Sequence, residues 1–353
     1  MKNILIIGCG LTGATLAYLH KQLGDSVTVF EKRNHIGGNI YTENINGICA
    51  HKYGAHIFHT SDTDVWNFVN KFTKFNKYTH QVKSRYNGKL YSLPINMNTF
   101  NEFFNITSPT EIKQEHIDYI KKCLFYGYTA KQWGKSINEI NKDVLNRLPY
   151  RETYNNNYFD DIYQGIPEEG YTKMIERMLE GVYVKLNISM DKNYDYSQYN
   201  IVYNTSPIDM FMGYELGELE YRSLRFVNEW HDNITFQDYP VINEADINVP
   251  YTRIIEHKHF NNTGQPGTIL TMEYPIKYDK YKNEPYYSIN NDINDSLHDK
   301  YIALAKNKYP NMIFCGRLGT YKYYDMDDAI REAINIVCQL SENYKSLTCM
   351  QLT

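Results

Sequence analysis

Runs of apolar residues at both ends of the chain predict strands of one buried parallel sheet. Residues 4–7 are continuously apolar and lead straight into glycines, and residues 27–30, 201–204 and 313–314 form similar runs. Continuous apolar runs are typical of strands that helices cover on both faces. Residues 329–340 carry apolar positions at helical spacing and predict one such covering helix.

The middle of the chain carries other patterns. Helical spacing over 62–78 and over 98–147 predicts helices, and the second stretch reads as an insertion of about fifty residues. Residues 81–93 predict a hairpin, because an Asn-Gly pair separates two short strand-like segments. Residues 221–287 alternate as strands do, with turn residues between them, and predict an antiparallel sheet. The expected helix caps are Asn98, Ser108 or Thr110, and Ser136.

Composition and charge exclude several classes of function. The 353-residue chain has 37 basic and 41 acidic residues and a net charge of −4, so we expect no nucleic-acid partner. No apolar stretch approaches the ~20 residues that a membrane span needs, so we expect no membrane insertion. The first strand starts at once, which leaves no room for a signal peptide, and six scattered cysteines without a C-x-x-C pair fit reduced thiols. We therefore expect a cytoplasmic protein.

The N-terminal glycines form a G-x-G-x-x-G turn between the first strand and the next helix. Gly8 permits the tight turn, Gly10 lets the backbone approach a pyrophosphate, and Gly13 lets the helix pack closely on the sheet. The helix N-terminus supplies N–H groups and a partial positive charge. Glu31 ends the second strand eighteen residues after Gly13, where it can accept hydrogen bonds from a ribose 2′-OH. Together these features predict a dinucleotide site.

A second glycine pair, Gly37-Gly38, follows the second strand. It suits a backbone that passes close to a ligand larger than NAD, as in an FAD enzyme, although an ordinary surface turn would also explain it. Near the other end of the chain, a strand again runs into a glycine turn at Gly316 and a helix start near Asp327. In a doubly wound fold, both ends can therefore converge on one elongated ligand.

Seven sequence blocks occur in a fixed order along the chain. Any one block is weak, but the ordered set covers nearly the whole chain and is very specific. The blocks are residues 54–59 (GAHIFH), 128–134 (YTAKQWG), 158–172 (YFDDIYQGIP…GYT), 219–224 (LEYRSL), 250–260 (YTRIIEHKHF after Pro250), 284–287 (EPYY) and 316–326 (GRL…YYDM). In this order they resemble the UDP-galactopyranose mutase family, in its bacterial form.

The resemblance implies an α/β fold with three parts. The first is a discontinuous, Rossmann-like FAD-binding domain over 1–80, 171–220 and 300–353. The second is a helical insertion domain with a mobile substrate loop over 97–165. The third is an antiparallel β-sheet domain over 81–96 and 221–299.

The resemblance also implies an isomerase that converts UDP-galactopyranose to UDP-galactofuranose reversibly and without net oxidation. In this chemistry N5 of reduced FAD attacks the anomeric carbon and UDP leaves, so the protein must supply position and charge. Guanidinium groups suit the departing diphosphate because their planar fork binds two phosphate oxygens. NAD(P)H is the implied reductant, and a homodimer is the implied assembly.

The family's site residues carry over to matching positions of this chain. Catalytic roles fall to Arg253, Arg147 and His56, with both arginines at the diphosphate and the histidine near the flavin ring. Tyr158, Tyr287 and Tyr323 match phosphate contacts, Tyr128 a platform for uracil, and Trp133 a tryptophan near the sugar or nucleotide. The implied cofactor-binding residues are Gly8, Gly10, Thr12, Gly13, Glu31, Lys32, Gly38, Asn39, His56, Arg317, Asp325 and Met326.

Several alternatives remain open from the sequence. The chain has 34 tyrosines, so Tyr286 and Tyr324 compete with their neighbours for the phosphate contacts. His56 and His59 lack cysteine or carboxylate partners at ligand spacing, so we expect no metal. An FAD-dependent oxidoreductase of the amine-oxidase-like class would share the fold, and a non-catalytic UDP-sugar binder with a vestigial flavin site would share the motifs.

Overall fold

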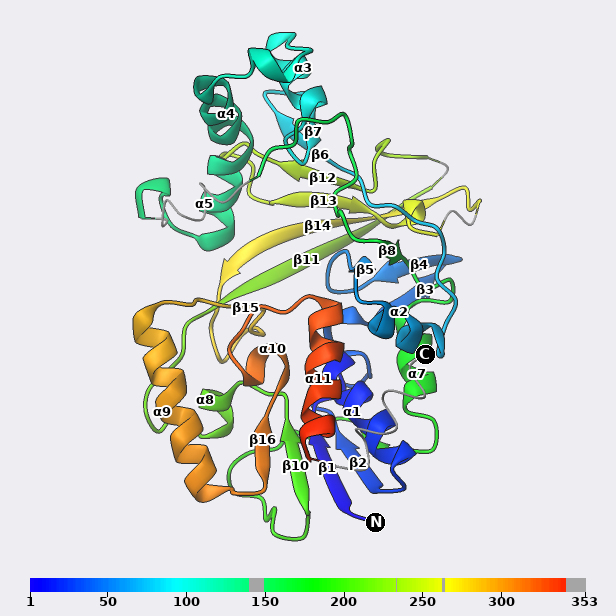
Figure 1. Cartoon of the computed structure of the whole chain (residues 1–353), viewed down its shortest axis with the longest axis vertical. Coiled ribbons are helices and arrows are strands. Elements are labelled where there is room, and N and C mark those ends of the chain that lie inside the picture. Colours follow the sequence, from blue (N-terminus) through cyan, green and yellow to red (C-terminus); the bar gives the residue numbers. More distant parts are fainter. Residues whose placement is uncertain (140–148, 233, 262–263, 341–353) are drawn as a thin grey trace.

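A parallel sheet at one end of the molecule, a larger sheet across its middle and a helical region at the other end make up the fold (Figure 1). These elements come from a computed structural model that describes residues 1–139, 149–232, 234–261 and 264–340. Within those residues, no helix is both long enough and apolar enough to cross a membrane.

The parallel sheet has five strands in the described part of the chain. In spatial order they are β16 (Met312–Phe314), β10 (Ile201–Asn204), β1 (Asn3–Ile7), β2 (Ser26–Phe30) and β9 (Tyr183–Lys185). Successive side chains of β1 enter two different cores: Ile4 and Ile6 lie in one cluster, and Leu5 and Ile7 lie in the other. Burial on both faces explains why the strand is continuously apolar.

Helices cover both faces of this sheet. α1 (Leu11–Gln22), α7 (Tyr171–Met178) and α11 (Met326–Leu340) contribute to the core that contains Ile4 and Ile6. α8 (Ile208–Phe211) and α9 (Asp292–Lys308) contribute to the core that contains Leu5 and Ile7. Figure 1 shows α1 and α11 side by side although they come from opposite ends of the chain, and the packing of the two helices agrees. The doubly wound arrangement expected from the sequence is therefore present.

The larger sheet has seven strands in the described residues. In spatial order they are β15 (Tyr287–Ser288), β11 (Tyr221–His231), β14 (Thr268–Lys277), β13 (Arg253–Glu256), β12 (Val241–Glu244), β6 (Val82–Tyr86) and β7 (Lys89–Leu93). The predicted hairpin is confirmed as β6–β7, with Asn87 and Gly88 at its turn. The predicted antiparallel layer is confirmed with one exception, because β12 pairs with β6 in parallel. Sequence alternation reports which face a residue occupies, but not the direction of its neighbouring strand.

The remaining elements connect these layers. α4 (Gln114–Lys121) runs through a π-helical turn (Lys122–Tyr126) into α5 (Gly127–Trp133), so that the three form one continuous helical segment. The other elements are β3 (Thr42–Ile45), β4 (Ile48–His51), β5 (Phe58–Thr60), β8 (Tyr163–Gly165), α2 (Thr63–Asn70), α3 (Met97–Phe104), α4 (Gln114–Lys121), α5 (Gly127–Trp133), α10 (Gly316–Gly319), and 3-10 turns at Gly38–Ile40, Pro109–Glu111, Ile137–Glu139 and His257–His259.

The helix predicted over 62–78 is too long. α2 ends at Asn70, and the Asn76 N–H donates to the Ile166 carbonyl at 2.9 Å, so the following segment is extended. The apolar residues there still enter the core, as Phe75 does, which is why helical spacing persisted in the sequence. The predicted boundary at residue 300 falls inside α9, which starts at Asp292.

The predicted caps are also shifted. Asn96, not Asn98, caps α3, since its side chain accepts from the N–H groups of Asn98 and Thr99. Neither Ser108 nor Thr110 caps α4, whose N-cap is Lys113. Ser136 precedes only a 3-10 turn. Clusters of Asn, Ser and Thr offer several cap candidates within three residues, and packing selects among them.

Candidate active site

A cavity of about 430 Å³ lies between the carboxyl end of the parallel sheet and the larger sheet. Ligands of open α/β sheets bind at this edge of the strands, and the volume is in the range of small-molecule sites. The lining includes the N-terminal glycines, the Gly37-Gly38 pair and the segment 316–318, together with Tyr128, Tyr158 and Arg253. One cavity therefore joins the predicted cofactor residues to the predicted substrate residues.

At the glycine turn, the first strand, the helix α1 and the Gly37-Gly38 pair approach one another very closely. A Cβ atom on Gly13 would lie 2.1 Å from the Gly8 carbonyl oxygen, and one on Gly38 would lie 2.9 Å from the Gly10 Cα atom. Gly10 is the N-cap of α1 and offers no side-chain hydrogen bond, so the first N–H groups of this helix keep their donor capacity. This is the backbone arrangement that a pyrophosphate requires.

Glu31 is 5% exposed and lines the cavity at the end of β2. Its carboxylate accepts from the Cys9 N–H at 2.7 Å and from the Arg33 N–H at 2.8 Å, which fixes both oxygens at the glycine turn. Arg33 Nη2 donates to Asn39 Oδ1 at 3.0 Å, whereas its buried Nη1 atom has no hydrogen-bond partner among the described residues. Lys32 pairs with Glu284. An unpaired guanidinium nitrogen beside the glycine turn suits an anionic or nucleotide ligand.

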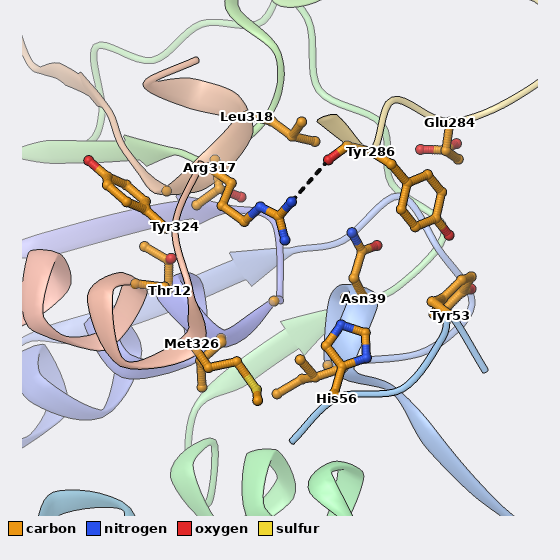
Figure 2. A pocket seen from close by; sticks show the side chains of 18 of the residues that line it. Thr12, Asn39, Tyr53, His56, Glu284, Tyr286, Arg317, Leu318, Tyr324 and Met326 are labelled. Atoms are coloured by element: carbon orange, nitrogen blue, oxygen red, sulfur yellow. Dashed lines mark hydrogen bonds between the residues drawn. The ribbon is translucent and has the colours of Figure 1, made fainter. Parts of the chain in front are cut away.

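The C-terminal motif forms the opposite wall. Figure 2 shows the Arg317 side chain reaching toward Tyr286, and Nη2 of Arg317 donates to the Tyr286 carbonyl at 3.2 Å. Gly316 lies against Thr12 of α1, and Met326 begins α11. Burial raises the pKa of Asp325, whose carboxyl group also lines the cavity. The predicted cofactor residues therefore line one cavity, and the glycine cradle, open helix N-terminus and unpaired Arg33 nitrogen fit an FAD.

Arg253 occupies the centre of the substrate side. The strand register places Asn243, Arg253 and Glu273 beside one another on β12, β13 and β14. Nε and Nη2 of Arg253 lie 2.9 and 2.8 Å from Oε2 of Glu273, which is 1% exposed. Burial disfavours the charge on Arg253, but Glu273 raises its pKa above the ordinary value, so the guanidinium stays cationic.

The four predicted tyrosines surround this arginine. Burial raises the pKa of Tyr128 above its ordinary value, while the Arg253 charge opposes the rise. Burial also raises the pKa of Tyr158, and the Arg253 charge again opposes the rise. Burial and Glu273 raise the pKa of Tyr287, whereas Arg253 lowers it. Tyr323 stacks on Tyr287 with ring centroids 6.2 Å apart. All four hydroxyl groups therefore stay protonated and can donate hydrogen bonds to an anion.

The neighbouring tyrosines have other partners. The Tyr324 hydroxyl group lies 3.1 Å from Glu332, and Tyr286 packs edge-to-face on Phe226 with ring centroids 5.6 Å apart. Arg317 lies over the rings of Tyr287 and Tyr323, at 5.6 and 4.9 Å. All four of these tyrosines line the cavity, and the Arg317 contacts favour Tyr287 and Tyr323 as partners of an anionic ligand.

His56 lines the cavity next to the glycine side, and Figure 2 places its ring below Asn39. Its Nδ1 atom lies 2.9 Å from the Gly54 carbonyl oxygen, which requires the Nδ1–H tautomer. Burial lowers the pKa of His56 to about 4, the Gly54 hydrogen bond opposes this, and Arg317 and Arg253 add to the lowering. His56 therefore faces the cavity as a neutral imidazole.

Three buried histidines predict an acid-sensitive fold. Burial lowers the pKa of His80 and of His257 to about 3, and lowers that of His51 well below its ordinary value. These rings stay neutral in the folded state, whereas in the unfolded chain they take up protons below about pH 6.5. The free energy of unfolding should therefore be at its maximum above pH 6.5 and fall as the pH is lowered from 6.5 to 3. At pH 5.5 the loss relative to that maximum should be about 1–1.5 kcal/mol per histidine.

Urea denaturation at pH 7.5 and 5.5 measures this loss. His51→Asn keeps an acceptor for the His56 N–H, which now donates to His51 Nδ1 at 3.1 Å, and removes one titrating ring. The pH dependence of this variant should be weaker than that of the parent. Equal unfolding midpoints of the parent protein at the two pH values would contradict the assignment.

Lys131 fixes the helix that carries Tyr128. Its Nζ atom donates to the carbonyl groups of Glu244, Asp246 and Tyr251, each at 2.8 Å, and burial lowers its pKa to about 8. In return, Nε of Arg222 donates to the Gln132 carbonyl at 2.9 Å near the end of α5. α5 and the larger sheet are thus joined by two cations that point in opposite directions.

Lys131→Met should reduce the free energy of unfolding by about 2–4 kcal/mol, because three carbonyl groups lose a charged donor and water replaces it only in part. Chemical denaturation measures the loss. Lys135→Met, at an exposed position two residues beyond α5, is the matched control and should stay within about 0.5 kcal/mol. Equal destabilisation by both variants would show that the hydrogen bonds of Lys131 to the three carbonyl groups do not stabilise the fold.

Two predicted residues are not part of the described cavity. Trp133 ends α5 but is absent from the cavity lining. Arg147 lies outside the described residues. No cluster of three or more histidine, cysteine or acidic side chains in the described residues could hold a metal ion.

The structure adds cavity residues that sequence reasoning missed. Asn243 and Arg33 line the cavity, and Glu273 holds Arg253. Strand alternation places Glu273 on one face of its strand but does not say which residue lies opposite. Only the register of β13 with β14 shows that the partner is Arg253.

Comparisons with known proteins agree with this geometry. A family model described as UDP-galactopyranose mutase matches residues 123–323, and one described as an NAD(P)-binding Rossmann-like domain matches residues 6–72. A dTDP-fucopyranose mutase of Escherichia coli is 36% identical, with 98% of this chain and 100% of that protein covered. A UDP-galactopyranose mutase of Mycoplasma genitalium is 32% identical, with 96% and 94% covered. A crystal structure of reduced UDP-galactopyranose mutase matches with a TM-score of 0.68 and 15% identity, over 97% and 96% of the two chains, which shows a shared fold.

Proposed function

The chain belongs to the UDP-galactopyranose mutase family of FAD-dependent isomerases, and on that premise we propose that it interconverts UDP-galactopyranose and UDP-galactofuranose. The observation that carries the proposal is the single cavity in which Arg253 and four tyrosines adjoin the glycine-lined cofactor side. The cofactor side would serve a redox flavoenzyme equally well, so the substrate side separates the two classes. A cluster of one cation and several hydroxyl donors beside it fits a substrate with a diphosphate group.

The cofactor side would hold FAD through the N–H groups at the start of α1, through Glu31 and through the segment that begins at Gly316. Reduced FAD supplies the nucleophile for the anomeric carbon when it is bound. His56, neutral and with its Nδ1–H directed to the Gly54 carbonyl, presents Nε2 as an acceptor, which can take a hydrogen bond from a flavin N–H group without adding a positive charge. NAD(P)H is the proposed reductant.

The substrate side would stabilise the leaving diphosphate. Arg253 is held by Glu273 before any ligand arrives, so its position requires no reorganisation during the reaction. Tyr158, Tyr287 and Tyr323 can donate O–H hydrogen bonds to phosphate oxygens, and Tyr128 offers a ring for the base. We propose Arg147 as the second cation. We propose Trp133 as a nucleotide or sugar contact that moves to the cavity when the ligand binds.

The assembly and compartment are part of the proposal. We propose a homodimer on the family resemblance, and a cytoplasmic location because no disulfide joins the cysteines of the described residues. Size-exclusion chromatography with light scattering tests the first statement, and fractionation of the source cells tests the second.

The test of the function is an anaerobic assay of the purified protein. Dithionite-reduced protein is incubated with UDP-galactofuranose, and chromatography should show UDP-galactopyranose; oxidised protein should give none. A second substrate arm uses dTDP-fucofuranose, because the relative from Escherichia coli covers the whole chain at 36% identity. Conversion only in that arm would replace the proposed substrate. UDP binding without conversion of either sugar would indicate a non-catalytic binder.

A further inference from the structure

A carboxylate outside the cavity holds both ends of the wall segment 316–324. Gly316 and Tyr324, the first and last residues of this segment, both line the cavity (Tyr324 is labelled in Figure 2). Oε2 of Glu332 accepts from the Gly316 N–H at 2.9 Å, and Oε1 accepts from the Tyr324 hydroxyl group at 3.1 Å. Glu332 lies in α11 and is absent from the cavity lining, and the proposed chemistry gives it no role.

The segment between these two ends is held together by its own hydrogen bonds. The Gly316 carbonyl accepts from the Thr320 N–H at 2.9 Å and from Thr320 Oγ1 at 2.8 Å. The Arg317 carbonyl accepts from the Lys322 N–H at 3.1 Å. Contacts at the two ends of such a hydrogen-bonded unit place it as a whole, so the two bonds to Glu332 determine where this wall of the cavity lies.

Gly316 is the point at which the segment meets the N-terminal cofactor motif. Its φ is +69°, and a Cβ atom there would lie 3.1 Å from Oγ1 of Thr12, near the start of α1. α11, which carries Glu332, packs beside α1 (Figure 1). Glu332 is therefore fixed relative to α1, and its bond to Gly316 fixes the C-terminal wall against the glycine turn.

The ionised form of Glu332 suits its two donors. Burial raises the pKa of Glu332, whereas the Gly316 N–H, the Tyr324 hydroxyl group and the Lys322 charge oppose the rise. A carboxylate accepts through both oxygens, whereas the protonated acid turns one oxygen into a donor. Hydrogen bonds to a partly buried carboxylate are also stronger than those between neutral groups, so both ends of the segment are held firmly.

We propose that Glu332 is a positioning residue for FAD, because it holds the segment 316–324 against α1 where the cofactor needs it. Glu332 acts through Gly316 and Tyr324, since it does not itself line the cavity. The inference rests on the cofactor part of the proposed function, since it takes FAD as the ligand. A wall that is already in place binds the cofactor without the cost of ordering a loop.

Release of flavin from the FAD-loaded protein tests this role. The protein is diluted in steps, and the fluorescence of the released FAD gives the dissociation constant for the parent protein and for Glu332→Ala, Glu332→Gln and Tyr324→Phe. Glu332→Ala should raise this constant by about 10-fold or more, because two hydrogen bonds to a charged group are lost. Glu332→Gln, whose amide can accept from Gly316 and donate to Tyr324, should stay within about 3-fold of the parent value. Tyr324→Phe should fall between these two variants.

Asp62→Ala is the matched control, because it breaks a second carboxylate contact of α11. Asp62 caps α2 and accepts from Nε of Arg331 in α11 at 2.7 Å, but it is absent from the cavity lining. Urea denaturation should show a loss of stability for Asp62→Ala, as expected for a lost helix cap, whereas its FAD dissociation constant should stay within about 2-fold of the parent value.

Equal weakening of FAD binding in Glu332→Ala and Asp62→Ala would show that only the stability of α11 matters, and would overturn the proposal. An unchanged FAD affinity in Glu332→Ala, or an affinity in Glu332→Gln as weak as that in Glu332→Ala, would overturn it as well. If Glu332→Ala does not fold, Tyr324→Phe decides, and it must release FAD more readily than Asp62→Ala. None of these readouts needs turnover, so a parent protein that binds FAD but isomerises neither sugar would contradict the proposed reaction alone.

Discussion

Replacing Arg253 by alanine should lower kcat/KM for UDP-galactofuranose by about 100-fold or more. The guanidinium charge acts on all four cavity tyrosines, and a charged hydrogen bond to a leaving diphosphate is worth on the order of 3 kcal/mol in the transition state. Steady-state kinetics of the reduced variant measure the loss. Arg225→Ala, which removes an exposed arginine that lies over the ring of Tyr274 at 4.1 Å, is the matched control and should keep near-normal activity.

The structure adds a second consequence for the same variant. Removal of Arg253 leaves the carboxylate of Glu273, 1% exposed, without its partner, and breaking a buried pair in this way costs about 3–5 kcal/mol of stability. The double variant Arg253→Ala with Glu273→Gln removes that buried charge. It should regain much of the stability and none of the activity. Recovery of activity together with stability would show that Arg253 acts only on the fold.

Replacing Gly13 by alanine should abolish flavin binding. The new Cβ atom would meet the Gly8 carbonyl oxygen at 2.1 Å and Ile6 Cγ2 at 3.3 Å, and the first of these is backbone that cannot rotate away. α1 would have to move off β1, which would carry the pyrophosphate-binding N–H groups out of place. The absorbance of the purified protein near 450 nm, taken relative to protein concentration, should fall to about background, as expected when this contact is lost.

The matched control for this variant is Gly24→Ala. Gly24 has a φ of +76°, and a Cβ there would meet nothing within 4 Å, so the substitution adds only left-handed backbone strain of roughly 1–2 kcal/mol. That variant should bind flavin normally. A yellow Gly13→Ala protein with a full complement of flavin would contradict the tight packing of α1 on β1.

The parallel sheet and the cofactor side could be predicted from sequence because their signals are local. The alternation of Ile4 and Leu5 between two cores requires a continuously apolar strand, and the short contacts of Gly13 and Gly38 require glycine. These requirements all act within β1, α1, β2 and the turn that follows β2, which are consecutive along the chain. The motif can therefore be recognised without knowing the rest of the fold.

The substrate side depends on contacts between distant segments, and so its details were not predictable. Glu273 is twenty residues from Arg253, and strand register alone makes them partners. His80 lies at the cavity because the Tyr158 segment pairs with its backbone from 78 residues away. Trp133, chosen by resemblance, ends α5 outside the cavity lining. Periodicity reports which face is buried, whereas tertiary packing decides which residues meet there.

The ratio of product formed to reductant consumed tests the central claim most directly. The protein is reduced anaerobically with one equivalent of dithionite, excess UDP-galactofuranose is added, and UDP-galactopyranose is quantified against the electrons supplied. A redox-neutral isomerase should form about 100 or more product molecules per reducing equivalent within minutes. One product molecule per equivalent, or product that stops when the reductant is used up, would contradict the account and indicate an oxidoreductase on the same fold.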